Sequence, residues 1–100
     1  MNDAKFYSFL GIIKKSGNLS SGYNTCEIQI KKGKGKMVLV AEDASHGTQD
    51  KFVNMCKANN IPFIIHGNKG DIGSSIGKMP TSVIVINDEN MSKVVLNMLR

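Results

Sequence analysis

The segment Gly73-Ser74-Ser75-Ile76-Gly77 matches the G-x-S-x-G pattern that presents a nucleophilic serine in many hydrolases. That chemistry needs the serine on a sharp turn between a strand and the next helix, with the catalytic histidine later in the chain. Here both histidines, His46 and His66, precede Ser75. We therefore interpret the glycines and serines as small residues that let a helix approach the sheet, and we expect no enzymatic activity.

Glu42 and Asp43 form a carboxylate pair directly after an apolar run. Paired carboxylates act as acid and base or bind a metal, but no nucleophile or second acidic cluster accompanies this pair. Hydrogen bonds to bases, or to the N-terminus of the next helix, fit these two residues better.

No cofactor or metal is expected. Cys26, Cys56, His46 and His66 are too far apart in sequence to nucleate a metal site, and the two cysteines form no CxxC pair. The stretch Gly33-Lys34-Gly35 precedes an expected strand instead of following one, so it is a basic connector and not a nucleotide loop.

Residues 20–26 could bind nucleic acid, because they are expected to open a helix that runs into Lys31 and Lys32. A helix start offers free N–H groups and a partial positive charge, which suit phosphate. Gly22 permits the close approach of a backbone, and the Asn24 amide could read a base edge with two hydrogen bonds. An ordinary helix cap explains the same residues.

The chain of 100 residues carries 13 Lys and Arg against 8 Asp and Glu, a formal charge of +5. The excess lies in residues 5–36, which contain seven lysines and one acid. Such a field attracts polyanions, nucleic acid first. Lysines that simply keep a small protein soluble are the alternative.

Length and hydropathy favour a single domain over residues 1–100, acting as a monomer. Apolar residues make up 41% of the sequence, enough for a core without disulfides. No apolar run approaches the roughly 18 residues of a membrane span, and the N-terminus lacks an apolar signal segment. We therefore expect no membrane partner and a cytoplasmic location.

Three short apolar runs predict buried strands, at Met37–Ala41, Phe63–His66 and Val83–Ile86. Helical spacing predicts helices after the caps Asp3 and Ser21, in the stripe of Phe52, Met55 and Cys56, weakly within residues 68–77, and after Asn87 or Asp88. This order predicts a three-layer α/β/α sandwich with a small mixed, mainly parallel central sheet.

Four segments together resemble the L7Ae/L30e family of small ribosomal proteins, and within it the short bacterial YlxQ-type members. They are Gly22-Tyr23-Asn24 through Lys31-Lys32-Gly33, Met37 through Ala44, Asn60-Ile61-Pro62-Phe63, and Asp71 through Gly77. The resemblance implies an α/β/α sandwich without enzymatic activity that binds kink-turn RNA, a sharply bent internal loop with tandem G·A pairs. It also implies a ribosome-associated or regulatory role.

The resemblance also implies the site. RNA contacts fall on residues of the second helix (Gly22, Tyr23, Asn24, Thr25, Ile28, Lys31), on Glu42 and Asp43 beside the RNA, and on an apolar loop with Met79 and Pro80. Lys15, Lys69 and Lys78 are the candidates for phosphate contacts.

The chain departs from the family pattern at two of these positions. Thr25 stands where the family has glutamate, and Ile28 where it has lysine. Lys31, further along the helix, is the candidate substitute for the missing lysine. A module that docks on the ribosome or a protein partner through the basic face, without reading RNA, is the competing interpretation.

Overall fold

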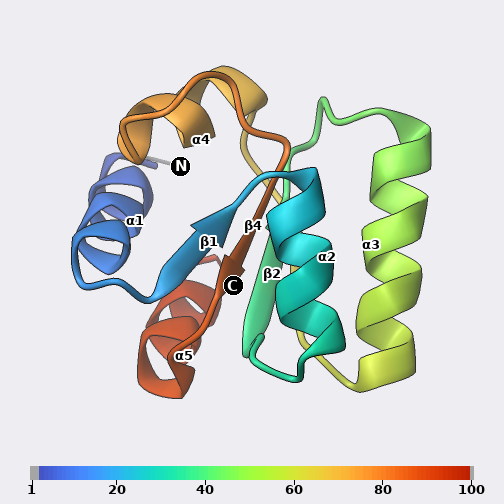
Figure 1. Cartoon of the computed structure of the whole chain (residues 1–100). Coiled ribbons are helices and arrows are strands. Elements are labelled where there is room, and N and C mark those ends of the chain that lie inside the picture. The colour runs from blue at the N-terminus through green and yellow to red at the C-terminus, as the bar shows by residue number, and fades with distance from the viewer. Residues whose placement is uncertain (1–2, 100) are drawn as a thin grey trace.

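A computed structural model describes residues 3–99, which form five helices and four strands (Figure 1). In chain order the elements are α1 (Ala4–Lys15), β1 (Leu19–Ser21), α2 (Tyr23–Lys31), β2 (Met37–Val40), α3 (His46–Asn59), β3 (Phe63–Ile65), α4 (Lys69–Ser75), β4 (Val83–Ile86) and α5 (Glu89–Met98). The three predicted strands and five predicted helices are all present, and β1 is an additional strand. The prediction that all three strands are buried is wrong for β3, an edge strand that is only partly buried and exposes Ile65.

Three of the helices begin at side-chain caps. The side-chain oxygens of Ser45, Asn68 and Asp88 accept the backbone N–H groups of Thr48, Asp71 and Met91, which satisfies donors that the first helical turn leaves unpaired. Asp3 occupies the N-cap position of α1 without a side-chain cap bond. Its carboxylate Oδ2 lies 3.1 Å from His66 Nε2, so it joins the start of α1 to the end of β3.

The sheet has the strand order β1-β4-β2-β3. Only β2 and β3 are parallel, while β4 is antiparallel to both β1 and β2. The mixed sheet is confirmed, but the expected parallel majority is wrong. α4 is only seven residues long, and Val83 pairs with Val40. The chain therefore re-enters the sheet at the end where β3 left it, and β4 runs back.

β1 places the start of α2. Leu19 pairs with Ile86 and Ser21 with Ile84, so this strand lengthens the sheet beside β4. The Gly22 N–H donates to the Val83 carbonyl at 3.1 Å, and α2 begins at the next residue. The helix cap is therefore Gly22 and not the predicted Ser21.

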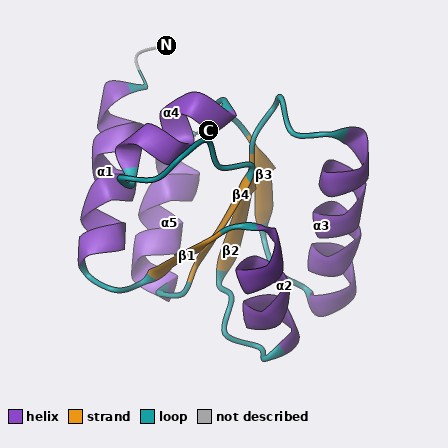
Figure 2. Cartoon of the chain, turned by 45° about the horizontal axis from the view of Figure 1, so that its top comes forward, coloured by secondary structure: helices purple, strands orange, loops and turns teal. Residues whose placement is uncertain are grey.

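Two layers of helices enclose the sheet, with α1, α4 and α5 on one face and α2 and α3 on the other (Figure 2). Every residue of β2 and β4 is buried, which matches the continuous apolar runs of a sheet covered on both faces. The buried core extends from these strands to the apolar stripes of the helices, which include Leu10, Ile30, Phe52, Ile72 and Val95. The predicted three-layer α/β/α sandwich is confirmed.

Gly73 and Ser75 of the G-x-S-x-G pattern are structural. A Cβ on Gly73 would collide with the Met79 carbonyl, and one on Gly11 of α1 would come within 2.9 Å of the Ser75 carbonyl. The Ser75 hydroxyl donates to the Ile72 carbonyl at 2.7 Å, within its own helix. Small residues thus let α4 lie close to α1 and to the 78–82 loop. The sequence-based expectation that they bring a helix close to the sheet is wrong.

Candidate nucleic-acid interface

The two ends of the sheet carry different groups. We call the end where β2 and β3 finish and β4 begins, at Val40, Ile65 and Val83, the carboxyl end. The opposite end, at Met37, Phe63 and Ile86, is the amino end. α2, α3 and the connection to α4 all begin at the carboxyl end, which is at the top of Figure 1.

A groove of about 370 Å³ lies at the carboxyl end, between the start of α2 and the loop before β4. We call it the α2 groove. Its lining comes from three separate segments, namely Ser21, Gly22 and Tyr23, then Thr48, and then Lys78, Met79, Pro80, Thr81 and Ser82. The helix start and the apolar loop, which the family resemblance assigned to one site, thus line the same groove.

The start of α2 is open to a ligand. Gly22 has a φ of 96°, and nothing lies within 4 Å of the position a Cβ would take. α2 has no side-chain cap, in contrast to α3, α4 and α5. The N–H groups of its first turn are therefore free to meet a phosphate or a base oxygen.

Asn24, Thr25 and Ile28 are exposed on α2. Within residues 3–99, the side chains of Asn24 and Thr25 have no hydrogen-bond partner, so the Asn24 amide keeps its full bonding capacity. Ile28 is 49% exposed, so an apolar side chain stands at the surface where the family resemblance implies a lysine.

Tyr23 packs between α2 and α3, and Lys31 pairs with an acid of its own helix. The Tyr23 ring meets Phe52 edge to face at 5.3 Å, and Lys51 Nζ lies 4.5 Å from its centroid. Glu27 binds both Lys51 (2.8 Å) and Lys31 (3.3 Å), and these hydrogen bonds hold the pKa of the Glu27 carboxyl below its ordinary value. Lys31 is thus an ion-pair partner of Glu27 as well as an exposed cation.

The opposite wall of the α2 groove presents Met79 to solvent with 82% of its surface exposed. Backbone bonds fix this loop, because Lys78 N–H donates to Gly73 and Thr81 N–H donates to Lys69. The Thr81 hydroxyl also donates to the Met79 carbonyl at 2.8 Å. An exposed apolar side chain on an anchored loop is suited to cover a flat apolar group such as a nucleobase.

Glu42 and Asp43 bind the protein's own backbone. Glu42 Oε2 accepts the Gly67 N–H at 3.1 Å, and Asp43 Oδ1 accepts the Lys69 N–H at 2.9 Å. Through these two hydrogen bonds, the residues that follow β2 hold the connection between β3 and α4 in place. The sequence suggested a bond to the N-terminus of the next helix, which is α3. Ser45 caps α3 instead, and Asp43 binds the first residue of α4.

The three phosphate candidates separate in space. Lys78 lines the α2 groove, and the Lys69 carbonyl is bonded to its loop. Lys15 is the last residue of α1 and lies at the amino end. The turn that follows α1 is bonded there, because the Asn18 carbonyl accepts the Asn87 N–H just after β4. The carboxyl end itself carries five acids (Asp3, Glu42, Asp43, Asp50, Asp71) and four lysines (Lys5, Lys51, Lys69, Lys78). The lysine excess therefore does not surround the α2 groove.

Thr48 is the groove residue that sequence reasoning missed. It belongs to the first turn of α3, and its N–H is taken by the Ser45 cap. Its place beside Gly22 depends on α2 and α3 packing side by side, and no local pattern in the sequence encodes that. Within residues 3–99, no group of three or more side chains could hold a metal, and no helix is long and apolar enough to cross a membrane.

The family model for the ribosomal protein L7Ae/L30e/S12e/Gadd45 family matches residues 4–96. The chain belongs to this family. It is 25% identical to the RNA-binding protein YlxQ of Bacillus subtilis over 99 residues, which cover 99% of each chain. It is also 27% identical to the large ribosomal subunit protein eL8 of Thermoplasma volcanium, over 74% of this chain and 62% of that protein.

Solved structures agree on the fold. A protein of unknown function from Bacillus halodurans superposes with a TM-score of 0.92 at 27% identity, covering 96% of this chain and 97% of its own. The 15.5kD RNA binding protein of Giardia lamblia superposes with a TM-score of 0.79 at 20% identity, covering 95% and 82%. The relatives are RNA-binding and ribosomal proteins, in agreement with the expectation of a non-enzymatic protein.

Proposed function

We propose that this protein is a non-enzymatic RNA-binding protein that recognises a kink-turn through the α2 groove. The observation that carries the proposal is the pairing of an uncapped helix start with an exposed apolar loop across one groove. Membership of the L7Ae/L30e/S12e/Gadd45 family and a relative named an RNA-binding protein support it.

The groove and the residues beside it, Asn24 and Lys69, have separate roles in this proposal. The free N–H groups that follow Gly22 bind a phosphate or a base oxygen at the kink. The unpartnered Asn24 amide hydrogen bonds to a base edge exposed by the G·A pairs. Met79 and Pro80 cover a nucleotide turned out of the stack, and Lys69 and Lys78 hold the adjacent phosphates.

The protein would bind the bent RNA more tightly than the extended RNA, and so shift the RNA toward the bent form. One copy suffices, because a single chain supplies both walls of the groove. The relatives named eL8 are large ribosomal subunit proteins, so ribosomal RNA is the first RNA to examine.

The decisive experiment compares two RNAs that differ only in the tandem G·A pairs. Fluorescence anisotropy measures the affinity for a kink-turn with these pairs intact and for one in which Watson–Crick pairs replace them. We expect much tighter binding to the intact kink-turn. Equal affinity for the two RNAs would rule out recognition of the kink and leave a general affinity for polyanions.

A protein-docking module is the second candidate, and the exposure of Ile28 favours it. An isoleucine in place of the expected lysine removes a cation that would contact RNA and leaves an apolar side chain on the exposed face of α2. Affinity capture from cells before and after RNase treatment separates the two functions. Partners that persist without RNA support docking, and partners lost with the RNA support the kink-turn proposal.

A further inference from the structure

The lysines of this protein gather at the amino end of the sheet, opposite the α2 groove. α1, α2 and α3 all finish there, β2 begins there, and α5 starts there. Their ends and connections carry eight lysines, which we call the lysine cluster: Lys14, Lys15, Lys31, Lys32, Lys34, Lys36, Lys57 and Lys93. Among residues 3–99, the acids at this end are Asp88 and Glu89, and Glu27 of α2 forms an ion pair with Lys31.

Helix dipoles account for only part of this cluster. Lys14, Lys15, Lys31 and Lys57 lie in the last turns of their helices, where cations are favoured by the partial negative charge of free carbonyls. Lys34 and Lys36 lie beyond α2, in the connection to β2, and the dipole gives no reason for them. These lysines need another explanation.

The connection that carries Lys34 and Lys36 is held in one shape. The Lys34 N–H donates to the Gln29 carbonyl at 3.0 Å, and the Lys36 N–H donates to Ile86 at 2.8 Å. Gly35 between them is buried, and a Cβ there would lie 3.2 Å from Val85. Both lysine side chains are exposed and, within residues 3–99, neither forms an ion pair. The backbone that carries these two lysines is therefore fixed, and their ammonium groups are free to bind an anion.

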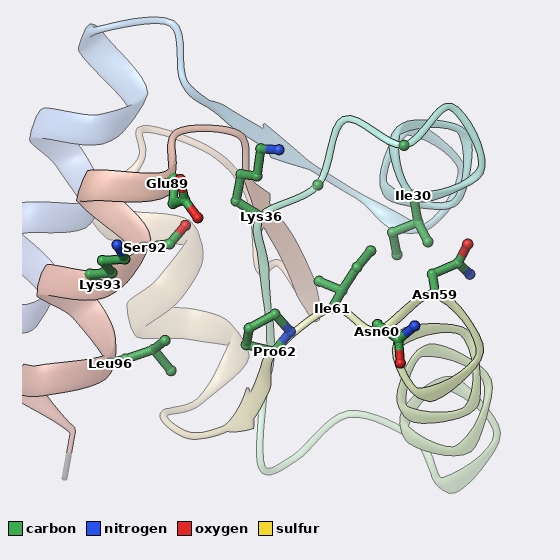
Figure 3. Close-up of a pocket in the computed structure, with 12 residues that line it drawn as sticks. Ile30, Lys36, Asn59, Asn60, Ile61, Pro62, Glu89, Ser92, Lys93 and Leu96 are labelled. Carbon is green, nitrogen blue, oxygen red and sulfur yellow. The ribbon is translucent and has the colours of Figure 1, made fainter.

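A groove of about 530 Å³ adjoins this connection (Figure 3). Lys36 stands between its two sides, of which α5 provides one with Glu89, Ser92, Lys93 and Leu96, and the Asn59–Pro62 turn with Ile30 provides the other. Its lining contains no aromatic side chain on which a base could stack. The lysine cluster contains no arginine either, so paired hydrogen bonds to base edges are not expected from it.

The lysine cluster acts independently of the α2 groove. α2 has nine residues and is about 13 Å long, at roughly 1.5 Å of rise per residue. The Debye length at physiological salt is about 8 Å, so charges at one end of α2 are largely screened at the other. Lys34 and Lys36 therefore add little to binding at Gly22 and Asn24 directly.

We propose that the lysine cluster is a second RNA-binding surface, which binds the phosphate backbone of an RNA helix without reading its sequence. One copy of the protein then holds RNA at both ends of its sheet, at a kink through the α2 groove and at a helix through Lys32, Lys34 and Lys36. The helix is either a distant stem of the kinked RNA or a separate RNA. This surface goes beyond the proposed function and does not depend on it.

The test measures the affinity for an unkinked RNA duplex over a range of salt concentrations by fluorescence anisotropy. Each lost phosphate contact lowers the salt slope by about 0.9. The double variant Lys34→Gln/Lys36→Gln is expected to lower the slope by about 2 and to weaken binding several-fold at low salt. Lys5→Gln, an exposed lysine at the start of α1, is the control and is expected to leave the slope close to that of the parent.

Two further arms keep this surface distinct from the kink site. Asn24→Ala is expected to leave duplex binding unchanged, and Lys34→Gln/Lys36→Gln is expected to leave binding to a kink-turn with short stems nearly unchanged. A kink-turn RNA with a long stem is compared with one that has short stems. If the double variant lowers affinity for the long-stem RNA alone, the ligand of the lysine cluster is a distant stem of the kinked RNA. A ternary complex of protein, short kink-turn and separate duplex identifies a second RNA.

Unchanged duplex affinity and slope in the double variant would overturn the proposal. The proposal also fails if poly-glutamate, at equal charge concentration, displaces the duplex and binds more tightly than it, because the surface would then be suited to an acidic protein segment. Circular dichroism of the double variant confirms that its fold is retained, as expected for two exposed side chains.

Discussion

The backbone N–H of Gly22 donates to the carbonyl of Val83 at 3.1 Å, and this bond joins the start of α2 to the start of β4. The 78–82 loop leads directly into β4, and Ser82 accepts the Ala41 N–H at 2.8 Å. The two walls of the α2 groove are therefore fixed to the same end of the sheet. A groove built this way is present before RNA binds, which lowers the ordering cost of recognition.

Asn24→Ala tests whether the helix start reads a base. The Asn24 amide is exposed and has no partner within residues 3–99, so its loss is expected to leave the melting temperature unchanged. Affinity for a kink-turn RNA is expected to fall by roughly 1 to 3 kcal/mol, as for the loss of a base contact. Asn54→Ala, an exposed asparagine on α3, is the matched control in the same anisotropy titration. Equal affinities of the two variants would place the base contact elsewhere.

Ile28→Lys restores the side chain that the family resemblance implies at this position. The new ammonium group would lie one turn beyond Asn24 on α2, and a charged hydrogen bond to the kink is expected to raise affinity by roughly 1.5 kcal/mol. Ile12→Lys is a close control, because Ile12 is 55% exposed and Ile28 is 49% exposed, while Ile12 lies on α1. A gain of similar size in both variants would show only a general effect of added charge.

The sequence predicted most of the individual helices and strands, but not how the strands pair in the sheet. Continuous apolar runs revealed β2 and β4, because strands buried on both faces leave no other pattern. The run at β3 also marked a strand, although this edge strand is only partly buried. β1 was missed because Leu19-Ser20-Ser21 contains one apolar residue, and only pairing with β4 makes it a strand. The direction of β4 was also predicted wrongly. The chain stays at the carboxyl end of the sheet through α4, so β4 must start there and run antiparallel to β2.

For the candidate site, too, the sequence identified residues without showing where the fold places them. The family resemblance implied one site from Gly22, Tyr23, Asn24, Met79 and Pro80, and in the structure Gly22, Tyr23, Met79 and Pro80 line one groove while Asn24 lies outside its lining. Most lysines of residues 5–36 are near residues 22–24 in sequence, but in the fold most of them lie at the opposite end of the sheet. Because α1 and α2 both run from the carboxyl end to the amino end, lysines in their last turns lie far from residues in the first turn of α2.

Asp43→Ala separates a structural carboxylate from one that contacts RNA. Removal of the acceptor leaves the Lys69 N–H without its 2.9 Å bond, which is expected to cost about 1 kcal/mol. For a domain of this size the melting temperature falls by roughly 4 to 8 °C per kcal/mol. Asp50→Ala, an exposed acid for which the structure shows no such bond, is the control. A large loss of RNA affinity with an unchanged melting temperature would instead indicate a direct contact.

The two cysteines predict a loss of stability at high pH. Burial raises the pKa of the Cys26 thiol to about 12 and that of Cys56 to about 11. An unfolded thiol ionises near pH 8.5, so the stabilisation is complete below about that pH and is lost as pH rises toward the folded values. In native protein at about pH 8, both thiols are expected to resist a thiol-specific reagent and to react after unfolding. Rapid labelling of Cys26 in the native state would contradict its burial.

Gly73→Ala tests whether the G-x-S-x-G pattern serves packing and, through packing, the α2 groove. A Cβ at this position meets the backbone of Met79 and Pro80, which cannot move without shifting the loop that Lys78 and Thr81 anchor. The overpacking is expected to cost roughly 1 to 3 kcal/mol of stability, even after the small gain from alanine in a helix.

The same substitution is expected to weaken kink-turn binding, because Met79 no longer lies correctly across the groove from Gly22. Gly47→Ala is the control, because nothing lies within 4 Å of its Cβ position and a gain of about 0.5 kcal/mol is expected there. Urea unfolding and RNA anisotropy are measured on both variants. If Gly73→Ala loses stability while RNA affinity stays at the parent value, the 78–82 loop positions no RNA contact, and binding rests on the start of α2 alone.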